Sequence, residues 1–271
     1  MPPSPSQPQP QPQPQRPLVF ITGASSGIGQ ALAWHYLQAG WRVALVARRA
    51  DVIKNWLSPH QTMASSYEIY SADVGQPESI IAAAQACLER QGLPDVVIAN
   101  AGISIGMDSA ERADLEVMAR IFATNNLGLA ATFHPFIAAM RARGSGRLVG
   151  IASVAGIRGL PGHGAYCASK AAVINYCESL RGELRGSGVR VVTLSPGYVD
   201  TPLTRQNRYA MPFLLPADEF ARQAARAIAR GDSYRVIPWP MAWAAKLLRL
   251  LPNALFDRLL AGRARKQRQA T

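Results

Sequence analysis

The sequence predicts an α/β protein built on a doubly wound parallel sheet of about seven strands, with helices on both faces. Short apolar runs alternate with amphipathic stretches of helical length over about 180 residues of the chain. The apolar runs lack the polar alternation of a half-exposed sheet, as is typical of parallel strands buried on both faces. With 271 residues and 48% hydrophobic content, the chain can bury one large core.

The apolar runs are the predicted strands, and right-handed crossovers are expected to connect them. They occupy residues 18–21, 42–47, 67–71, 95–99, 147–152, 189–194 and 234–237. Helical periodicity marks residues 30–39, 77–90, 114–143 and 164–185.

The chain divides into three regions by composition. Residues 1–17 alternate Pro and Gln and cannot form a core, so a disordered, extended tail is predicted. Residues 18–237 carry the strand and helix pattern. Residues 238–271 read as an amphipathic and basic helical extension.

The formal net charge of +12 is compatible with nucleic acid, anionic lipid or an acidic cofactor. No Lys/Arg run is interleaved with aromatic residues, so we expect no nucleic-acid partner. Cys87, Cys167 and Cys177 show neither a disulfide framework nor metal-ligand spacing, and no metal site is expected. Because no apolar signal-peptide run begins the chain, a cytoplasmic location is predicted, with a peripheral position at the inner face of a membrane as the alternative.

A glycine-rich turn separates the first predicted strand from the first helix. Gly23, Gly27 and Gly29 follow the spacing G-x-x-x-G-x-G. Glycines allow a close backbone approach, and a helix N-terminus favours an anion, so this context predicts a phosphate-binding turn. The other interpretation is a tight strand-to-helix turn with no ligand.

The end of the second strand bears on the type of nucleotide. Ala47 stands where a carboxylate would accept the ribose hydroxyls of NADH, and Arg48 follows it. A guanidinium pairs with a 2′-phosphate, whereas a carboxylate repels it. NADP(H) is therefore the expected cofactor, with NAD(H) as the alternative.

Further polar residues follow the ends of later strands, where open α/β sheets bind ligands. Asp73 ends the third strand, Asn100 the fourth and Ser153 the fifth. Asn125 and Asn126 interrupt an apolar helix, and a buried amide without partners costs about 1 to 3 kcal/mol. At least one of these two asparagines is expected to have a specific role.

Tyr166 and Lys170 are four residues apart in a predicted helix, so both point to one side. A phenol beside an ammonium can serve as a proton donor, and the ammonium is expected to lower the pKa of the phenol. His163 lies near this pair and is interpreted as a loop or solvated histidine.

Taken together, these motifs resemble the short-chain dehydrogenase/reductase family over about residues 18–237. The motifs are TGxxxGxG from Thr22, Asp73, NAG from Asn100, NxxG from Asn125, Ser153, YxxxK from Tyr166 and PG from Pro196. Family members are Rossmann-like, NAD(P)(H)-dependent oxidoreductases, commonly homodimers or homotetramers. The resemblance implies the catalytic residues Asn125, Ser153, Tyr166 and Lys170.

The resemblance also implies roles for individual residues. Tyr166 is the acid/base, Lys170 and a positive nicotinamide ring tune it, Ser153 aligns the substrate, and Asn125 holds a relay water. The implied cofactor-binding residues are Gly23, Ser25, Ser26, Gly27, Ile28, Gly29, Arg48, Asp73, Val74, Asn100, Ala101, Gly102, Tyr166, Lys170, Pro196, Gly197, Val199 and Thr201. Ser26 departs from the basic residue that many NADP-preferring members have before the second glycine.

Residues 198–215 are expected to cover the active site. They contain Leu203, Met211, Phe213 and Leu214, which favour an apolar or lipid-like carbonyl or alcohol substrate over a sugar. The alternative is that these side chains only pack the covering segment itself.

The C-terminal extension carries Trp239, Trp243 and several leucines, and Lys246, Arg249 and Pro252 interrupt its apolar run, so it is not a membrane span. A helix packed on the core or on a subunit neighbour is preferred over a helix at a membrane surface. The function predicted is hydride transfer between nicotinamide and a carbonyl or secondary alcohol. Two alternatives are a non-catalytic NADP(H)-sensing module and a membrane-associated scaffold.

Overall fold

The structure is a computed structural model that describes residues 16–205, 207, 210–262 and 268. The predicted disordered tail lies outside the described residues except for Arg16 and Pro17. Arg16 donates a hydrogen bond from Nη1 to Ser66 Oγ at 3.0 Å, and the Arg16 carbonyl accepts one from Arg42 Nε at 3.1 Å.

The core is a seven-stranded sheet in the order β3-β2-β1-β4-β5-β6-β7, with every neighbouring pair parallel. The predicted fold class is confirmed. The strands are β1 (Leu18–Thr22), β2 (Arg42–Ala47), β3 (Tyr67–Ser71), β4 (Val96–Ala99), β5 (Gly146–Ile151), β6 (Val189–Pro196) and β7 (Tyr234–Ile237). The strand order reverses between β1 and β4, and open sheets of this type bind ligands beyond the carboxyl ends at such a point.

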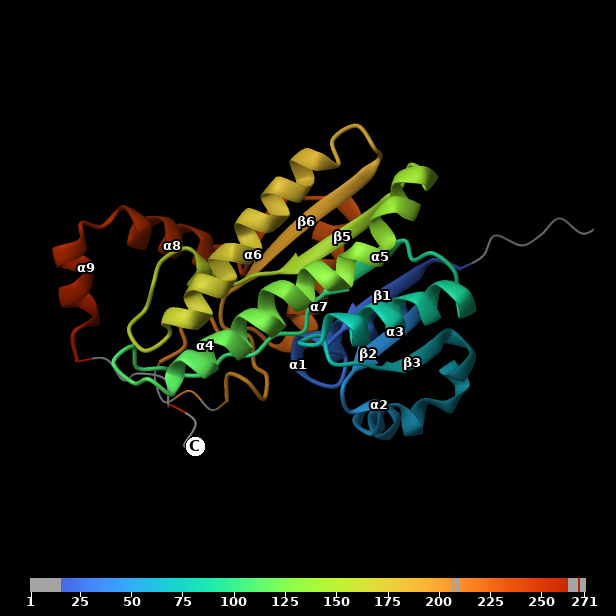
Figure 1. The fold of residues 1–271 in the computed structure, drawn as a ribbon, viewed down its shortest axis with the longest axis horizontal. Coiled ribbons are helices and arrows are strands. Elements are labelled where there is room, and N and C mark those ends of the chain that lie inside the picture. Colours follow the sequence, from blue (N-terminus) through green and yellow to red (C-terminus); the bar gives the residue numbers. More distant parts are fainter. Residues whose placement is uncertain (1–15, 206, 208–209, 263–267, 269–271) are drawn as a thin grey trace, which may run out of the picture.

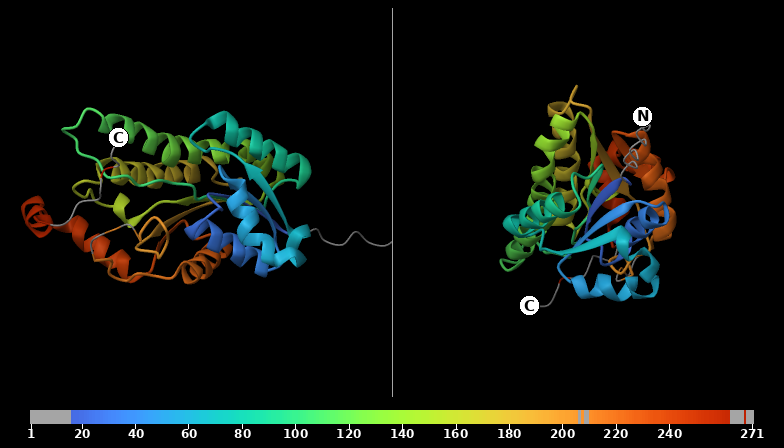
Figure 2. Two further views of the ribbon diagram at one scale, coloured as in Figure 1. Left: turned by 90° about the horizontal axis from the view of Figure 1, so that it is seen from below. Right: turned by 90° about the vertical axis from the view of Figure 1, so that its right-hand side faces the viewer.

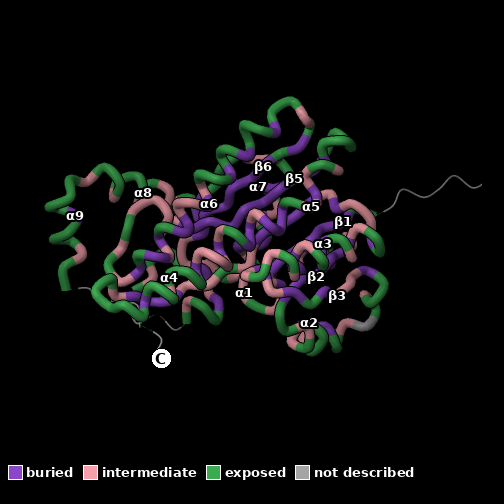
Figure 3. The backbone as a smooth tube through the Cα atoms, viewed as in Figure 1, coloured by how far each residue is buried: buried purple, intermediate pink, exposed green. Residues whose placement is uncertain are grey.

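Helices cover both faces of the sheet, as the two views of Figure 2 show. Alternation along β1 divides the core: Leu18 and Phe20 pack into one apolar cluster, and Val19 and Ile21 into the other. The first cluster is covered by α3 (Pro77–Arg90), α5 (Gly128–Arg143) and α6 (Gly164–Glu183), and the second by α1 (Gly27–Gln38), α2 (Ala50–Leu57) and α7 (Ala217–Arg230). Figure 3 shows the buried strands between these exposed outer surfaces.

The helix predicted at residues 114–143 is interrupted at its centre. It consists of α4 (Asp114–Phe122), a π-helical turn (Ala123–Leu127) and α5. Gly128 begins α5 against the end of β3, where a Cβ would lie 2.5 Å from the carbonyl oxygen of Val74. The wide turn therefore occurs where the helix passes closest to the carboxyl edge of the sheet, and such turns are frequent at functional sites.

The C-terminal region forms two helices, α8 (Pro240–Leu250) and α9 (Asn253–Leu260), which project from one end of the molecule (Figure 1). Pro252 separates them because a proline cannot continue a helix. Within the described parts of the chain, no helix is both long enough and apolar enough to cross a bilayer.

Candidate active site

The turn between β1 and α1 requires glycine for reasons visible in its backbone. Gly23 and Gly27 have φ angles of 69° and 57°, in the left-handed region that favours glycine. Gly29 has an ordinary φ, but a Cβ there would lie 2.2 Å from the carbonyl oxygen of Gly23 and 2.5 Å from Asn100 Nδ2. The three glycines therefore let the start of α1 approach the ends of β1 and β4.

A cavity of about 290 Å³ lies along the carboxyl edge of the sheet above this turn. All of the expected cofactor-binding residues line it except Gly29, which packs beneath the turn. Residues outside the expected cofactor-binding set also line it: Val46, Ala47, Arg49, Ala72, Ile103, Thr124, Ile151, Ala152, Pro202, Leu203 and Thr204. Most of them immediately precede or follow a motif residue, which is the signal that could have identified them.

This cavity fits a dinucleotide by its own geometry. The glycine turn keeps the start of α1 close to the ends of β1 and β4, beside the cavity, and no acidic residue occupies the first turn of α1. The start of a helix carries partial positive charge, so its N-terminus can receive a phosphate.

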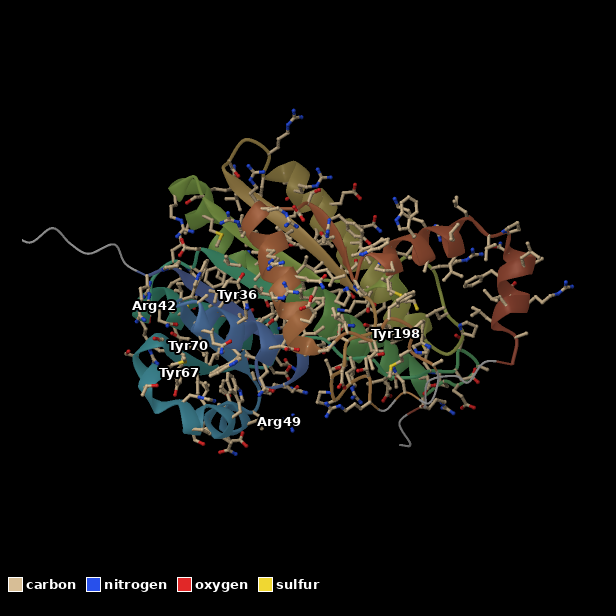
Figure 4. All side chains as sticks on the ribbon, turned by 180° about the vertical axis from the view of Figure 1, so that it is seen from behind. Tyr36, Arg42, Arg49, Tyr67, Tyr70 and Tyr198 are labelled. Carbon is tan, nitrogen blue, oxygen red and sulfur yellow. The ribbon has the colours of Figure 1, made fainter. Side chains whose placement is uncertain are left out.

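At the far end of this cavity, Arg48 and Asp73 face one another. Arg48 Nη1 lies 3.8 Å from Asp73 Oδ2, and their side chains are 68% and 41% exposed. Asp73 Oδ1 accepts a hydrogen bond from the Gly75 backbone N–H at 2.9 Å. An ion pair this long and exposed contributes little stability, so the guanidinium can engage another anion. Arg49, by the start of α2 in Figure 4, lines the same cavity.

Ser153, Tyr166 and Lys170 converge at the opposite end of the cavity. Ser153 follows β5, and its Oγ accepts a hydrogen bond from the Ala155 backbone N–H at 3.1 Å. Lys170 is buried and donates a hydrogen bond from Nζ to the carbonyl oxygen of Ile151 at 2.8 Å. Its Nζ lies 5.9 Å from the centroid of the Tyr166 ring, so the two side chains share one face of α6, as the spacing predicted.

Burial dominates the electrostatics of this pair. It raises the pKa of Tyr166, and a hydrogen bond with Ser153 acts in the opposite direction. Burial also lowers the pKa of Lys170 to about 8. The net shift of the Tyr166 pKa is therefore opposite to the expected lowering, because burial of the phenol outweighs the other effects. Tuning by the ring of a bound nicotinamide stays a prediction.

Asn125 lies just outside the cavity, in the π-helical turn, with every side-chain polar atom bonded. Its Oδ1 accepts from the Ile103 N–H at 2.9 Å, and its Nδ2 donates to the Ile103 carbonyl at 3.0 Å and to Ser169 Oγ at 2.9 Å. Ser169 Oγ in turn donates to the carbonyl oxygen of Tyr166 at 2.8 Å. Asn125 is thus joined to the Tyr166 helix through Ser169, and these bonds use both Nδ2 donors and one of the two acceptor sites of Oδ1.

Ser169 was not identified from the sequence, although its place beside Lys170 in the YxxxK motif is a signal. It also receives a hydrogen bond at its carbonyl oxygen from Asn126 Nδ2 at 2.9 Å. Both asparagines therefore bind Ser169, Asn125 through a fully bonded buried amide and Asn126 through its Nδ2 alone.

A second cavity, of about 270 Å³, adjoins the first and shares Ser153, Tyr166, Gly197, Leu203 and Thr204 with it. Its remaining wall is largely apolar and comes from the loop after β5, the segment after β6, and both C-terminal helices. These residues include Val154, Ile157, Leu160, Tyr198, Pro212, Phe213, Met241, Ala244, Ala245, Leu248, Phe256, Leu259 and Leu260. Figure 4 shows Tyr198 toward the side from which α8 and α9 project.

The covering segment at residues 198–215 is described except for residues 206, 208 and 209. Its two ends are joined, because Val199 and Leu215 form a parallel bridge. Leu203 and Phe213 line the second cavity, whereas Met211 and Leu214 do not. The expected apolar cover is thus formed by part of the predicted set, together with the C-terminal helices.

Two residues of the loop before α6 also line the second cavity. His163 lies in the loop, as one of the two interpretations expected, but it is buried rather than solvated, with its ring Nδ1 3.3 Å from the carbonyl oxygen of Pro161. Arg158 binds the C-terminal helices: Nη1 donates to the carbonyl oxygens of Leu248 and Leu251, the latter at 2.8 Å.

Comparisons with known proteins agree with this geometry. Residues 17–211 match the family described as short chain dehydrogenase. An uncharacterized oxidoreductase of Myxococcus xanthus is 38% identical over 237 residues, covering 88% of this chain and 93% of that protein.

Solved structures of the same fold were found with either form of the nicotinamide cofactor. An alcohol dehydrogenase of Thermococcus sibiricus, complexed with 5-hydroxy-NADP, has a TM-score of 0.73 and 28% identity, covering 82% of this chain and 96% of that one. A 3-ketoacyl-(acyl-carrier-protein) reductase of Brucella melitensis, complexed with NADH, has a TM-score of 0.74 and 26% identity, covering 82% and 97%. This chain belongs to the short-chain dehydrogenase/reductase family of oxidoreductases.

Proposed function

We propose that this protein is an NADP(H)-dependent oxidoreductase that interconverts a carbonyl group and a secondary alcohol on an apolar substrate. One observation carries the proposal: Ser153 and Tyr166 stand on the boundary between the two cavities. The first cavity has the glycine turn and Lys170, and the second is largely apolar. A reacting carbon bound in the second cavity would therefore face the first at these two hydroxyl groups.

The roles follow from the chemistry of each side chain. A bound nicotinamide supplies the hydride in reduction and accepts it in oxidation. Tyr166 donates its phenolic proton to the carbonyl oxygen, and Ser153 donates a hydrogen bond that orients the same oxygen. Lys170 holds a positive charge within reach of the phenolate that remains, and binds the ribose hydroxyls. In the reverse direction Tyr166 accepts the proton of the alcohol.

Asn125 acts in this proposal as a positioning residue. Through Ser169 it holds the first turns of α6, which carry Tyr166 and Lys170. The relay water assigned to Asn125 would then bind at a backbone oxygen of the π-helical turn, because that turn breaks the regular pairing of carbonyls.

Preference for NADP(H) is supported by three features of the first cavity. Ala47 leaves no carboxylate at the end of β2, Arg48 is the next residue, and its ion pair with Asp73 is long and exposed. A 2′-phosphate beside Arg48 would gain a charge-assisted hydrogen bond, which is worth about 1.5 to 3 kcal/mol.

The test is a measurement of NADPH and NADH oxidation with ketones and aldehydes of increasing apolar length. We expect NADPH turnover that improves with length, and at least a hundredfold loss of kcat in Tyr166→Phe with its NADPH affinity retained. Tyr176→Phe is the matched control, because Tyr176 lies on the same helix and is exposed. A wild-type protein that binds NADPH but oxidises it with no carbonyl in the series would refute the proposal and favour a nucleotide sensor.

A further inference from the structure

Helix α8 has two apolar faces with different surroundings. Met241 and Ala245 are buried and, with Ala244 and Leu248, line the second cavity. The opposite face carries Trp239, Trp243, Leu247 and Leu250, which are 66%, 61%, 64% and 79% exposed. Their spacing of four, four and three residues places them along one stripe. The helix therefore separates the cavity from an exposed apolar surface.

Helix α9 continues this arrangement. Phe256 and Leu260 line the second cavity, whereas Leu255 is 52% exposed and Leu259, at the rim of the cavity, is 46% exposed. The outer face of α8 and α9 is defined here by the six exposed apolar residues Trp239, Trp243, Leu247, Leu250, Leu255 and Leu259. Figure 3 shows how much of both helices is exposed.

Positive charge accompanies this outer face. Lys246, Arg249 and Arg258 are exposed, and within the described part of the chain none of them forms an ion pair. Lys246 Nζ lies 5.2 Å from the centroid of the Trp243 ring. From residue 238 to the end, the sequence has seven basic residues and one acidic residue.

We propose that the outer face of α8 and α9 docks on the surface of an anionic lipid bilayer. Tryptophan and leucine on one face, with lysine and arginine beside them, are the composition of helices that lie in a membrane interface. Each basic residue near an anionic surface adds to this attraction. A second copy of this chain fits less well, because a symmetric pairing would place unpaired cations opposite cations.

Docking in this orientation would connect the membrane with the active site. The inner faces of the same two helices line the second cavity, so docking would place the bilayer directly on the other side of the cavity wall. This consequence rests on the proposed function, whereas the docking itself does not, because it requires neither cofactor nor turnover.

Vesicle flotation of the full-length protein tests the docking. We expect binding to vesicles of phosphatidylcholine with about 30% phosphatidylglycerol, weak binding to phosphatidylcholine alone, and loss of binding as salt increases. The double variant Trp243→Gln/Leu247→Gln should reduce the bound fraction at least tenfold, and Lys246→Glu/Arg249→Glu should do the same. Leu115→Gln/Met118→Gln removes two exposed apolar residues from α4 and should bind like the wild type.

Three outcomes would overturn the proposal. The wild type could fail to float with anionic vesicles. The Trp243/Leu247 variant could bind as well as the wild type, which would assign binding to the basic residues after Gly262. The outer-face variants could instead dissociate a stable dimer in sedimentation, without any vesicle binding by the wild type, which would assign the face to a second copy.

Kinetics separate this proposal from the proposed function. With a water-soluble short ketone, the outer-face variants should keep the wild-type kcat/KM within about twofold. With a long-chain ketone dissolved in anionic vesicles, their kcat/KM should fall about tenfold. Inactivity of every protein toward all ketones would count against the proposed function and leave the flotation result to decide the docking.

Discussion

The guanidinium carbon of Arg158 lies 3.7 Å from the centroid of the Phe256 ring, and this contact joins the loop after Ser153 to α9. The same side chain donates hydrogen bonds to the C-terminal carbonyls of α8 and, at 3.1 Å, to Asn253 Oδ1. A single planar cation therefore closes the end of one helix and stacks on the next. Lysine cannot reproduce this arrangement, because it lacks the forked donors and the flat face.

We predict that Arg158→Lys raises the KM for a long apolar ketone about tenfold, since the C-terminal wall of the second cavity loses its attachment; tenfold corresponds to about 1.4 kcal/mol. The kcat with a short ketone should stay within about twofold. Steady-state kinetics of both substrates measure this division. Arg222→Lys is the control, because Arg222 pairs with Glu219 on α7, away from both cavities. An equal fall in kcat for both substrates would mean that Arg158 supports the chemistry itself.

Gly29→Ala should lower both the stability of the protein and its affinity for NADPH, although the φ angle of Gly29 is one that alanine can adopt. A Cβ would lie 2.2 Å from the carbonyl oxygen of Gly23, so the turn must move, and overpacking of this kind costs about 1 to 3 kcal/mol. We expect a lower midpoint in urea and a loss of NADPH affinity. Gly182→Ala, in α6 with open space around it, should instead stabilise the protein by about 0.5 to 1 kcal/mol. Normal NADPH affinity in Gly29→Ala would refute the close packing described for this turn.

Arg48→Ala should weaken NADPH binding about tenfold to a hundredfold, as expected for the loss of one charge-assisted hydrogen bond. NADH affinity should change less than about twofold, because NADH has no 2′-phosphate. Fluorescence titration of both cofactors measures the two effects. Arg226→Ala removes an exposed arginine from α7 and should affect neither. Equal losses for the two cofactors would refute the assignment of Arg48 to the phosphate.

The lowered pKa of Lys170 predicts a dependence of stability on pH. A free lysine titrates near pH 10.4, and burial lowers the pKa of Lys170 to about 8. Between these values the unfolded chain binds a proton that the folded chain does not, so this group makes the free energy of unfolding rise with pH. The rise should be about 2 kcal/mol from about pH 7.5 to about pH 9.5.

Urea unfolding of the wild type and of Lys170→Met at the two pH values isolates this effect. Cys87 and Cys177, whose pKa values burial raises to about 12, contribute with the opposite sign in both proteins. The wild type should gain about 2 kcal/mol relative to Lys170→Met as the pH rises. Equal pH dependence in the two proteins would show that the pKa of Lys170 is the same in the folded and unfolded states.

The sheet could be predicted because its strands are buried on both faces, so apolar runs such as residues 42–47 stand out without any tertiary information. Most residues that line the first cavity could be predicted for a related reason. Parallel sheets bind ligands at the carboxyl ends of their strands, and the polar residues at these ends directly follow a strand in the sequence. The helices α2 and α7 were not among the predicted stretches, although α7 has a strongly two-sided pattern.

The partners of Asn125 and the two faces of the C-terminal helices could not be predicted, because they depend on contacts between segments far apart in the chain. Nothing near Asn125 in sequence indicates that its amide binds the backbone of Ile103 and the hydroxyl of Ser169. The apolar C-terminal residues likewise could not be divided by sequence between a cavity wall and an exposed face. The preferred packing of that helix on the core holds for the side bearing Met241 and Ala245, and not for the side bearing Trp243.

Because of the π-helical turn at Ala123–Leu127, the site depends on the number of residues in this part of the chain as well as on their identity. Such a turn holds one residue more than the α-helical turn that it replaces. Deleting a residue of this turn other than Asn125 would restore an α-helical turn and change the directions in which the remaining side chains of the turn point. Asn125 would then turn away from Ser169 even though both residues were still present. In this part of the fold, we expect the deletion of one residue to disturb the site more than most substitutions do.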